Sequence, residues 1–337
     1  MKNSILAASL LLIQPTLAQT NPGTMPLPDS LRSTAVLVQV QVPQPGHRRE
    51  ASADVSSGPV TLKLETEKGQ RKVEFEFPAG SQVVSKNVHA ETDEEDISLD
   101  DAWQYGEPTL LMIATAADSA AGFTLYSGYV KQANKAWQLV GTCRVASWQK
   151  QLTELSLTTD APKRKPLAAQ WQQAWSQRPN GTWKSLLQDT AKAPTINWTG
   201  HADSLAQAAA DDSLIKQARQ TPTWSRLQAT QGIYYEITEP GNGGPVALNH
   251  RVTVHYKGYL FTNGEVFDQT RDKPASFPLR GLIKGWQVAL PLVQVGGKIK
   301  VVIPSGQAYS IRTRAAKIPP NSILVFEIEV LESKPAQ

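Results

Sequence analysis

Hydrophobic and polar residues alternate along the first half of the chain. Valines do so at residues 36–42, and the same period of two returns at 60–64 and 73–77, on either side of a Lys68-Gly69 turn. A period of two is typical of a strand with one buried face, so the last two runs predict a hairpin. Further β-type runs lie at 109–114, 123–130 and 137–145. Residues 34–160 are therefore expected to form an all-β domain, a small antiparallel sandwich or barrel.

The pattern changes after a basic stretch bounded by prolines at 161–166. Leu167, Trp171 and Trp175 recur at helical spacing and predict a helix that Asn180-Gly181 would end. Residues 183–187 predict a second short helix, and the alanine-rich residues 201–219 predict a third, so residues 161–226 are expected to be a linker and helical segment. The two tryptophans on one stripe leave two interpretations open. The stripe packs on the β domain or on neighbouring helices, or it forms a homodimer contact or a surface that grips unfolded chains.

Strand periodicity returns between residues 227 and 334. Runs of β type occupy 233–237, 252–256, 299–303 and 323–330, and one short run of helical period lies at 283–293. Antiparallel strands with a single short helix predict an α+β fold in which the helix packs across one face of the sheet. The chain is thus expected to be multidomain, with an all-β domain, a helical connecting segment and a C-terminal α+β domain.

Composition mainly excludes functions. The length of 337 residues allows two or three domains, and the net charge of +4, from 34 basic and 30 acidic residues, is too balanced to indicate nucleic-acid binding. No zinc-ligand spacing appears in the sequence. The acidic run at 91–96 lacks the pattern of a calcium loop, so we expect a solvated loop at these residues. We expect neither a metal nor a cofactor in this protein. Cys143 is the single cysteine and lies in an apolar run, which predicts a buried, unreactive thiol.

The first residues indicate export. Met1-Lys2 is followed by an apolar run from Ile5 to Ile13 and by small residues up to Ala18, the order of a secretory signal peptide at 1–18. A run of this length is too short to cross a bilayer core of about 30 Å, so no membrane span is expected after cleavage. Residues 19–33 are expected to be a flexible leader. The expected location is the periplasm, with secretion or attachment to the envelope as alternatives.

The candidate chemistry begins in residues 252–268. A strand there runs into an Asn263-Gly264 turn, after which Phe267 stands beside the carboxylate of Asp268. An aromatic-lined pocket that holds one fixed polar group is the usual form of a site for a small apolar ligand. We therefore expect the function to reside in the C-terminal domain.

Several spaced motifs in this domain occur together in one known family. They are Val-His-Tyr-Lys-Gly258, Gly-Glu-Val-Phe-Asp268, Phe277-Pro-Leu, Ile-Lys-Gly-Trp286, Val-Gly-Gly297, Ile-Pro-Ser305, Gln-Ala-Tyr309, Ile-Pro-Pro320 and Leu-Val-Phe326. With these motifs in this order, residues 228–333 resemble the FKBP-type peptidyl-prolyl cis-trans isomerases. The resemblance covers less than a third of the chain and does not extend to residues 19–220.

The resemblance implies a proline pocket and assigns its residues. Trp286 would form the floor, and Tyr256, Phe267 and Phe326 the walls. The remaining implied residues are Leu282 and Ile283 at the rim, Tyr309 as the donor to the substrate carbonyl, Ile318 on the loop side, Phe277 in contact with substrate and Asp268 at the polar edge. The implied partners are X-Pro segments of unfolded or folding proteins, and macrolide ligands of the rapamycin type. The implied reaction uses no nucleophile, metal or cofactor.

Two departures from the family pattern concern the edge of this pocket. Family members usually have a glycine after the tyrosine and more glycines before Ile-Pro-Pro, whereas residues 310–317 contain no glycine and three added cations. The segment after Asp268 is also short, and its basic partner is either Arg271 or Lys273. We expect an exported isomerase that speeds proline-limited folding of envelope or secreted proteins. The alternatives are a chaperone or binding module with a weakened isomerase pocket, and a β domain that binds an envelope partner.

Overall fold

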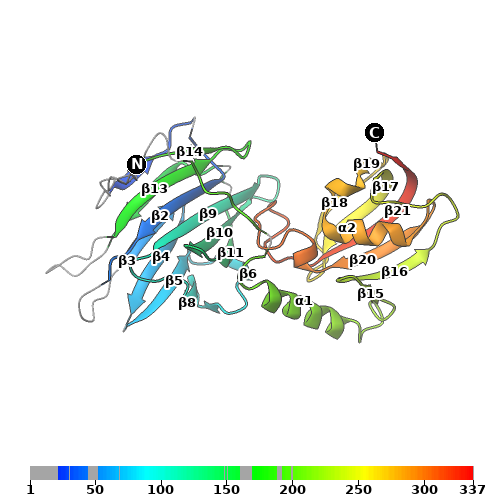
Figure 1. The fold of residues 1–337 in the computed structure, drawn as a ribbon, viewed down its shortest axis with the longest axis horizontal. Helices are drawn as coiled ribbons and strands as arrows, with labels where there is room; N and C mark the ends of the chain where they lie inside the picture. The colour runs from blue at the N-terminus through cyan, green and yellow to red at the C-terminus, as the bar shows by residue number, and fades with distance from the viewer. Residues whose placement is uncertain are drawn as a thin grey trace, which may run out of the picture.

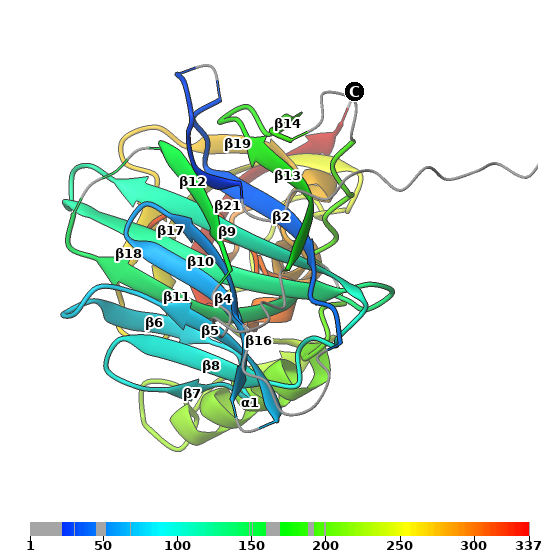
Figure 2. The same ribbon diagram turned by 90° about the vertical axis from the view of Figure 1, so that its left-hand side faces the viewer.

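The computed structural model describes residues 22–29, 31–44, 52–67, 69–147, 149, 151–159, 169–187, 192–198 and 200–336. The expected signal peptide at 1–18 and the basic stretch at 161–166 lie outside the described residues. The described strands form three sheets, and two of them build the N-terminal half of the molecule while the third belongs to the C-terminal half (Figure 1). Figure 2 looks along the long axis, with the two N-terminal sheets in front of the third.

The two N-terminal sheets are antiparallel throughout. The first runs in the order β1 (Gly23–Pro26), β12 (Glu154–Thr158), β3 (Ser52–Ser57), β4 (Val60–Glu67), β5 (Gln70–Glu76), β8 (Asp96–Asp100) and β7 (Glu91–Thr92). The second runs in the order β14 (Trp183–Ser185), β13 (Gln170–Gln177), β2 (Ala35–Gln41), β9 (Pro108–Asp118), β10 (Phe123–Gln132), β11 (Gln138–Val145) and β6 (Gln82–Lys86). Residues 23–26, expected in a flexible leader, pair with β12 instead.

The two sheets share one apolar core and so form a sandwich rather than a barrel. Alternate side chains of β2, β4, β5, β9 and β10 meet in it, and Val38, Leu62 and Phe75 are fully buried there. The expected strands of this region and the hairpin of β4 with β5 are confirmed. Cys143 is buried as predicted, and burial raises the pKa of its thiol to about 12, which keeps it protonated and unreactive near neutral pH.

The predicted helices at 167–175 and 183–187 are wrong, because the described residues there form β13 and β14. β13 pairs with β2 along its length, and a bulge between Trp171 and Gln173 changes which side chains face the sandwich core. Trp171 consequently packs in that core, and Trp175 packs on the outer face of the second sheet. Both are buried, so the tryptophan stripe packs on the β domain and offers no surface for a second copy or an unfolded chain.

One helix of the connecting segment does form. It is α1 (Ser204–Ala218), the alanine-rich stretch expected at 201–219. On one side, Asp203 at its start accepts a hydrogen bond from the Asn87 amide at 2.7 Å. On the other side, buried Asp211 accepts from the backbone N–H and the hydroxyl of Ser305 at 2.7 and 2.6 Å. The helix therefore connects the sandwich to the C-terminal domain.

The C-terminal domain is an antiparallel sheet with one short helix across it, as the sequence predicts. The sheet order is β15 (Gln228–Thr230), β16 (Ile233–Glu239), β20 (Lys298–Ile303), β21 (Leu324–Pro335), β17 (His250–Leu260) and β18 (Val266–Gln269), with β19 (Ala275–Pro278) paired to β17. Helix α2 (Lys284–Ala289) lies over one face, between the 3₁₀ turns Leu279–Gly281 and Leu290–Leu292. A third 3₁₀ turn, Ser305–Gln307, precedes Tyr309.

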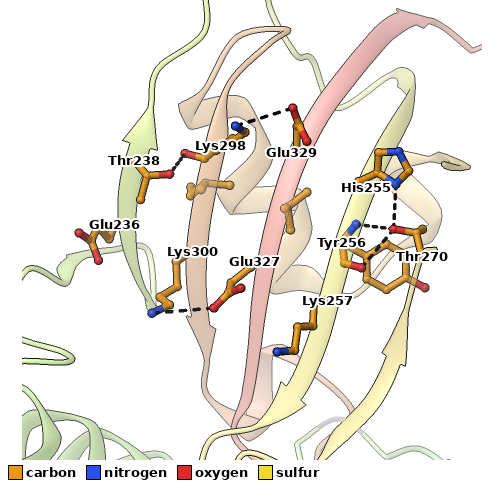
Figure 3. A pocket seen from close by; sticks show the side chains of 12 residues that line it. Glu236, Thr238, His255, Tyr256, Lys257, Thr270, Lys298, Lys300, Glu327 and Glu329 are labelled. Atoms are coloured by element: carbon orange, nitrogen blue, oxygen red, sulfur yellow. Dashed lines mark hydrogen bonds and ion pairs between the residues drawn. The ribbon is translucent and has the colours of Figure 1, made fainter. Parts of the chain in front are cut away.

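The other face of this sheet carries rows of alternating charge (Figure 3). In one row Glu236, Lys300, Glu327 and Lys257 stand in register on neighbouring strands, and the Lys300 ammonium lies 4.0 Å from Glu327. Opposite charges that face each other across strands are mildly stabilising and stay hydrated. This face forms a hollow of about 480 Å³ that is lined mainly by charged and polar residues.

The loop that follows Tyr309 packs against the outer face of the second sandwich sheet (Figure 1). Ile311 is 1% exposed among apolar side chains of β2, β9, β10 and β13. The hydroxyl of Tyr129 on β10 donates to the Ile311 carbonyl at 2.7 Å and accepts from the Thr313 N–H at 3.1 Å. Because burial raises the pKa of Tyr129 to about 12, its hydroxyl remains a donor at neutral pH.

Further contacts continue along residues 313–317. The Thr313 hydroxyl donates to the Ser127 hydroxyl at 2.7 Å, and buried Ala316 packs against Phe123 and Leu125. The Lys317 ammonium lies 3.8 Å from the carboxylate of Asp118. The loop, together with residues 193–198, covers the outer face of the second sheet, which explains why nearly all of β10 is buried on both faces. We call these contacts of residues 311–317 the loop–sandwich interface.

No helix in the described part of the chain is long and apolar enough to cross a bilayer.

The loop–sandwich interface predicts slow hydrogen exchange at Thr313. Replacing Tyr129 by Phe removes the acceptor of the Thr313 N–H and the donor to the Ile311 carbonyl, so local opening should become easier by about 1–3 kcal/mol. Exchange of the Thr313 amide should then accelerate by roughly ten- to a hundredfold. Tyr126→Phe, which changes the same strand but only a contact with Gln149, should leave it unchanged. Fast exchange of this amide in the unaltered protein would contradict the interface.

Candidate active site

One aromatic cavity collects every candidate residue of the sequence analysis. The cavity has a volume of about 480 Å³ and opens on the helix-covered side of the C-terminal sheet. Its lining includes Tyr256, Phe267, Asp268, Phe277, Leu282, Ile283, Trp286, Tyr309, Ile318 and Phe326. Three further residues line it that the motifs did not identify, namely Gly281, Arg314 and Ala315.

Trp286 stands at the centre of the aromatic rings. It belongs to α2 and is 4% exposed. Tyr256 of β17 and Phe326 of β21 meet it nearly edge-on, with ring centroids 5.4 and 5.2 Å away, and Phe277 of β19 lies at 6.4 Å. Edge-to-face rings at these distances attract each other beyond the effect of area alone. The sheet and the helix thus hold a rigid apolar floor.

Gly258 permits the close packing of the two phenylalanine walls. A Cβ at this position of β17 would lie 2.6 Å from the Phe267 ring and 2.7 Å from the Phe326 ring. Any side chain there would push these rings out of their edge-on contact, whose centroids are 5.5 Å apart. The glycine in the motif that ends at residue 258 therefore has a packing reason.

Asp268 is engaged by a pocket tyrosine. The Tyr256 hydroxyl donates to its carboxylate at 2.5 Å, and burial together with this carboxylate raises the pKa of Tyr256 above its ordinary value. Among the described residues no ion pair joins Asp268 to Arg271 or Lys273, so neither expected basic partner is observed. The hydrogen bond fixes the orientation of both side chains at the pocket edge.

Residues 309–318 close the remaining side of the cavity. Ser310 takes a left-handed conformation with φ 55°, at the position where a glycine was expected. Such a conformation costs a non-glycine residue roughly 1–2 kcal/mol. Its backbone is held on both sides, since its N–H donates to the Ser305 carbonyl and its carbonyl accepts from the Asn321 N–H, each at 2.9 Å. The loop therefore keeps the backbone shape that glycine would favour.

The arrangement is suited to binding rather than to covalent chemistry. Tyr309 is half-buried and lines the cavity, and Leu282 and Ile283, directly before α2, line the same cavity. The only carboxylate of the lining is Asp268, already engaged by Tyr256. An apolar cavity with a few fixed polar groups can select one conformation of a small apolar ring and exclude water from it.

The packing at Gly258 gives a direct test of the cavity. Gly258→Ala should displace the Phe267 and Phe326 rings and destabilise the chain by about 1–3 kcal/mol in denaturant unfolding. Gly244→Ala is the control, because a Cβ there has nothing within 4 Å. Equal stability of the two variants would contradict the described packing.

Comparison with known proteins points to one family for this part of the chain. Residues 244–331 match the family model described as FKBP-type peptidyl-prolyl cis-trans isomerase. A probable FKBP-type peptidyl-prolyl cis-trans isomerase of Haemophilus influenzae is 39% identical over 141 residues, which cover 39% of this chain and 58% of that protein. The isomerase FkpA of Escherichia coli (strain K12) is 44% identical over 110 residues, which cover 32% of this chain and 40% of that protein.

The crystal structure of FkpA from Escherichia coli is 36% identical over 40% of this chain and 62% of that one, with a TM-score of 0.35. The chain thus spans about half the length of the curated relatives named above. The sequence match coincides with the sheet, helix and aromatic cavity described above. The C-terminal domain of this chain belongs to the FKBP-type peptidyl-prolyl cis-trans isomerases.

Proposed function

We propose that this chain is an exported peptidyl-prolyl cis-trans isomerase that speeds the proline-limited folding of envelope or secreted proteins. The observation that carries the proposal is the single cavity that joins all ten candidate residues around Trp286. The signal-like residues 1–18 support export, with the periplasm as the proposed location.

The proposed reaction is a rotation about one amide bond. Its barrier is about 18–20 kcal/mol, because the C–N bond has partial double-bond character. For X–Pro bonds the two isomers have similar free energies, so a catalyst has to change only the rate. Without a catalyst, isomerisation takes on the order of tens to hundreds of seconds. Each tenfold acceleration requires about 1.36 kcal/mol of tighter binding to the twisted amide than to the planar one.

The cavity supplies such preferential binding in two ways. The prolyl ring would rest on Trp286 between Tyr256, Phe267 and Phe326, away from water. A twisted amide has lost resonance and carries less charge separation, so an apolar, water-poor site favours it over the planar form. The Tyr309 hydroxyl would donate to the substrate carbonyl, and the backbone at Leu282 and Ile283 would hold the flanking peptide.

The remaining pocket residues have supporting roles in this proposal. Phe277 and Ile318 would enclose the substrate at the two ends of the cavity, and Asp268 would orient Tyr256 through their hydrogen bond. Macrolide ligands of the rapamycin type are proposed to compete for the same cavity. We propose that the sandwich extends to Ser185 and that the isomerase domain occupies residues 227–334.

The alternative is a chaperone or binding module whose isomerase pocket is weakened. The glycine-free loop favours this alternative, whereas the positive φ of Ser310 opposes it, because the serine adopts the backbone shape that glycine would favour. Suppression of aggregation of a proline-free client by the full chain, without any isomerase activity, would favour this alternative.

A proline-limited refolding assay on the full chain tests the proposed function. The unaltered protein should accelerate the slow phase, and Trp286→Ala should reduce kcat/KM by roughly tenfold or more, because it removes the floor and its apolar contact. Tyr309→Phe should reduce it by about fivefold, the value of one hydrogen bond of about 1 kcal/mol.

The matched control is Trp224→Ala. Trp224 packs on Phe261 away from the cavity, so this variant should retain its activity. Equal activity of Trp286→Ala and the unaltered chain, or no acceleration by the unaltered chain, would refute the proposed function.

A further inference from the structure

Two arginines flank Tyr309 at the mouth of the cavity. Arg314 lines the proline cavity, and its guanidinium carbon lies 5.8 Å from the centre of the Tyr309 ring. Arg312 lines a second cavity of about 410 Å³ that shares Tyr309 with the first and is bounded also by Trp198, His201 and Ser204. Both arginines are exposed, and within the described residues neither forms an ion pair. Positive charge therefore stands on both sides of Tyr309.

The loop–sandwich interface holds the backbone that carries these arginines. Ile311 and Thr313 alternate with the two arginines, and Ala316 follows two residues after Arg314. All three are anchored to the second sandwich sheet. Arg314 lines the proline cavity and Arg312 lines the second cavity, so the two side chains leave this held backbone toward different cavities beside Tyr309. A side chain on a fixed backbone loses less conformational freedom on binding than one on a mobile loop.

The charges around Arg314 leave it available to a substrate. The only carboxylate of the cavity lining is Asp268, which comes from β18 and accepts the Tyr256 hydroxyl. The third cation of the loop, Lys317, is turned away and paired with Asp118 of the sandwich. A guanidinium presents a planar fork of donors that matches a carboxylate. Arg314 is thus the cation of this loop that a bound peptide would meet.

We propose that Arg314, supported by Arg312, forms a subsite for an acidic side chain on the residue that precedes the isomerised proline. The inference rests on the proposed function and specifies its substrate class. The preceding residue is favoured because its carbonyl is the one that Tyr309 would bind, and Arg314 lies over the ring of Tyr309. The sandwich takes part in this specificity by holding the loop. The preferred substrates are Glu-Pro and Asp-Pro segments.

The test compares two peptides that differ in charge but not in shape. The full chain is assayed with the p-nitroanilides of Ala-Glu-Pro-Phe and Ala-Gln-Pro-Phe, and the ratio of their kcat/KM values is formed within each variant, so that differences in folded fraction cancel. The unaltered chain should prefer the glutamate peptide by roughly two- to fivefold, the range of an exposed ion pair. The preference should fall as salt is added, because exposed charges are screened.

Variants at Arg314 identify the source of the preference. Arg314→Gln should bring the ratio close to one, and Arg314→Lys should restore part of it. Arg280→Gln, an equal loss of charge at an exposed residue outside the cavity lining, should keep the ratio of the unaltered chain.

The outcomes separate the two proposals. Isomerisation of both peptides with a ratio of one, or with a preference that survives Arg314→Gln, overturns the acidic subsite and leaves the proposed function standing. No acceleration of either peptide overturns both.

Discussion

The contact between Tyr129 and the loop after Tyr309 joins the two halves of this molecule. A buried hydroxyl on β10 holds the carbonyl of Ile311 and the N–H of Thr313, while Ile311 fills the outer face of the second sheet. An unpaired polar group at such a buried place costs about 1–3 kcal/mol, so the three groups are stable only together. Ile311 is two residues from Tyr309, and the sandwich therefore fixes the position of the pocket edge.

This constraint relates the fold to the proposed chemistry. The floor and walls of the cavity come from α2 and from three strands of one sheet. They are rigid because the aromatic rings contact one another and leave no room for a side chain at Gly258. The open side of the cavity is formed by the loop after Tyr309, which belongs to the C-terminal domain but is held by the sandwich. The proposed catalysis, by preferential binding of a twisted amide, would depend on both parts, because a loose edge would admit water to the amide.

Local patterns in the sequence were sufficient for most of the longer strands and for the pocket. Alternation of Val36, Val38 and Val40 identified β2, and the spaced motifs brought together ten residues that line one cavity. The failures have physical reasons. Trp171 and Trp175 are four residues apart, a spacing that suits one face of a helix. The same spacing also fits a strand when a bulge between the two residues turns them to opposite faces of the sheet. A continuous apolar run at 110–113 was a signal that β9 is covered on both faces.

The role of residues 310–317 had no local signal. Tyr129 and Ile311 are 182 positions apart, and no periodicity links them. The missing glycines were interpreted as a departure that weakens the pocket, whereas Ser310 adopts the left-handed conformation and the neighbouring residues are held by the sandwich. Arg314 was missed as a lining residue for the same reason, since its position depends on this interface.

A double-mutant cycle tests most directly whether the sandwich acts on the pocket through this loop. The ratio of kcat/KM for the Glu-Pro and Gln-Pro peptides is measured in the unaltered chain, in Tyr129→Phe, in Arg314→Gln and in the double variant. We expect Tyr129→Phe to lower the ratio when Arg314 is present and to have no effect on it when Arg314 is absent. An equal effect of Tyr129→Phe in both backgrounds, or no effect in either, would contradict the account.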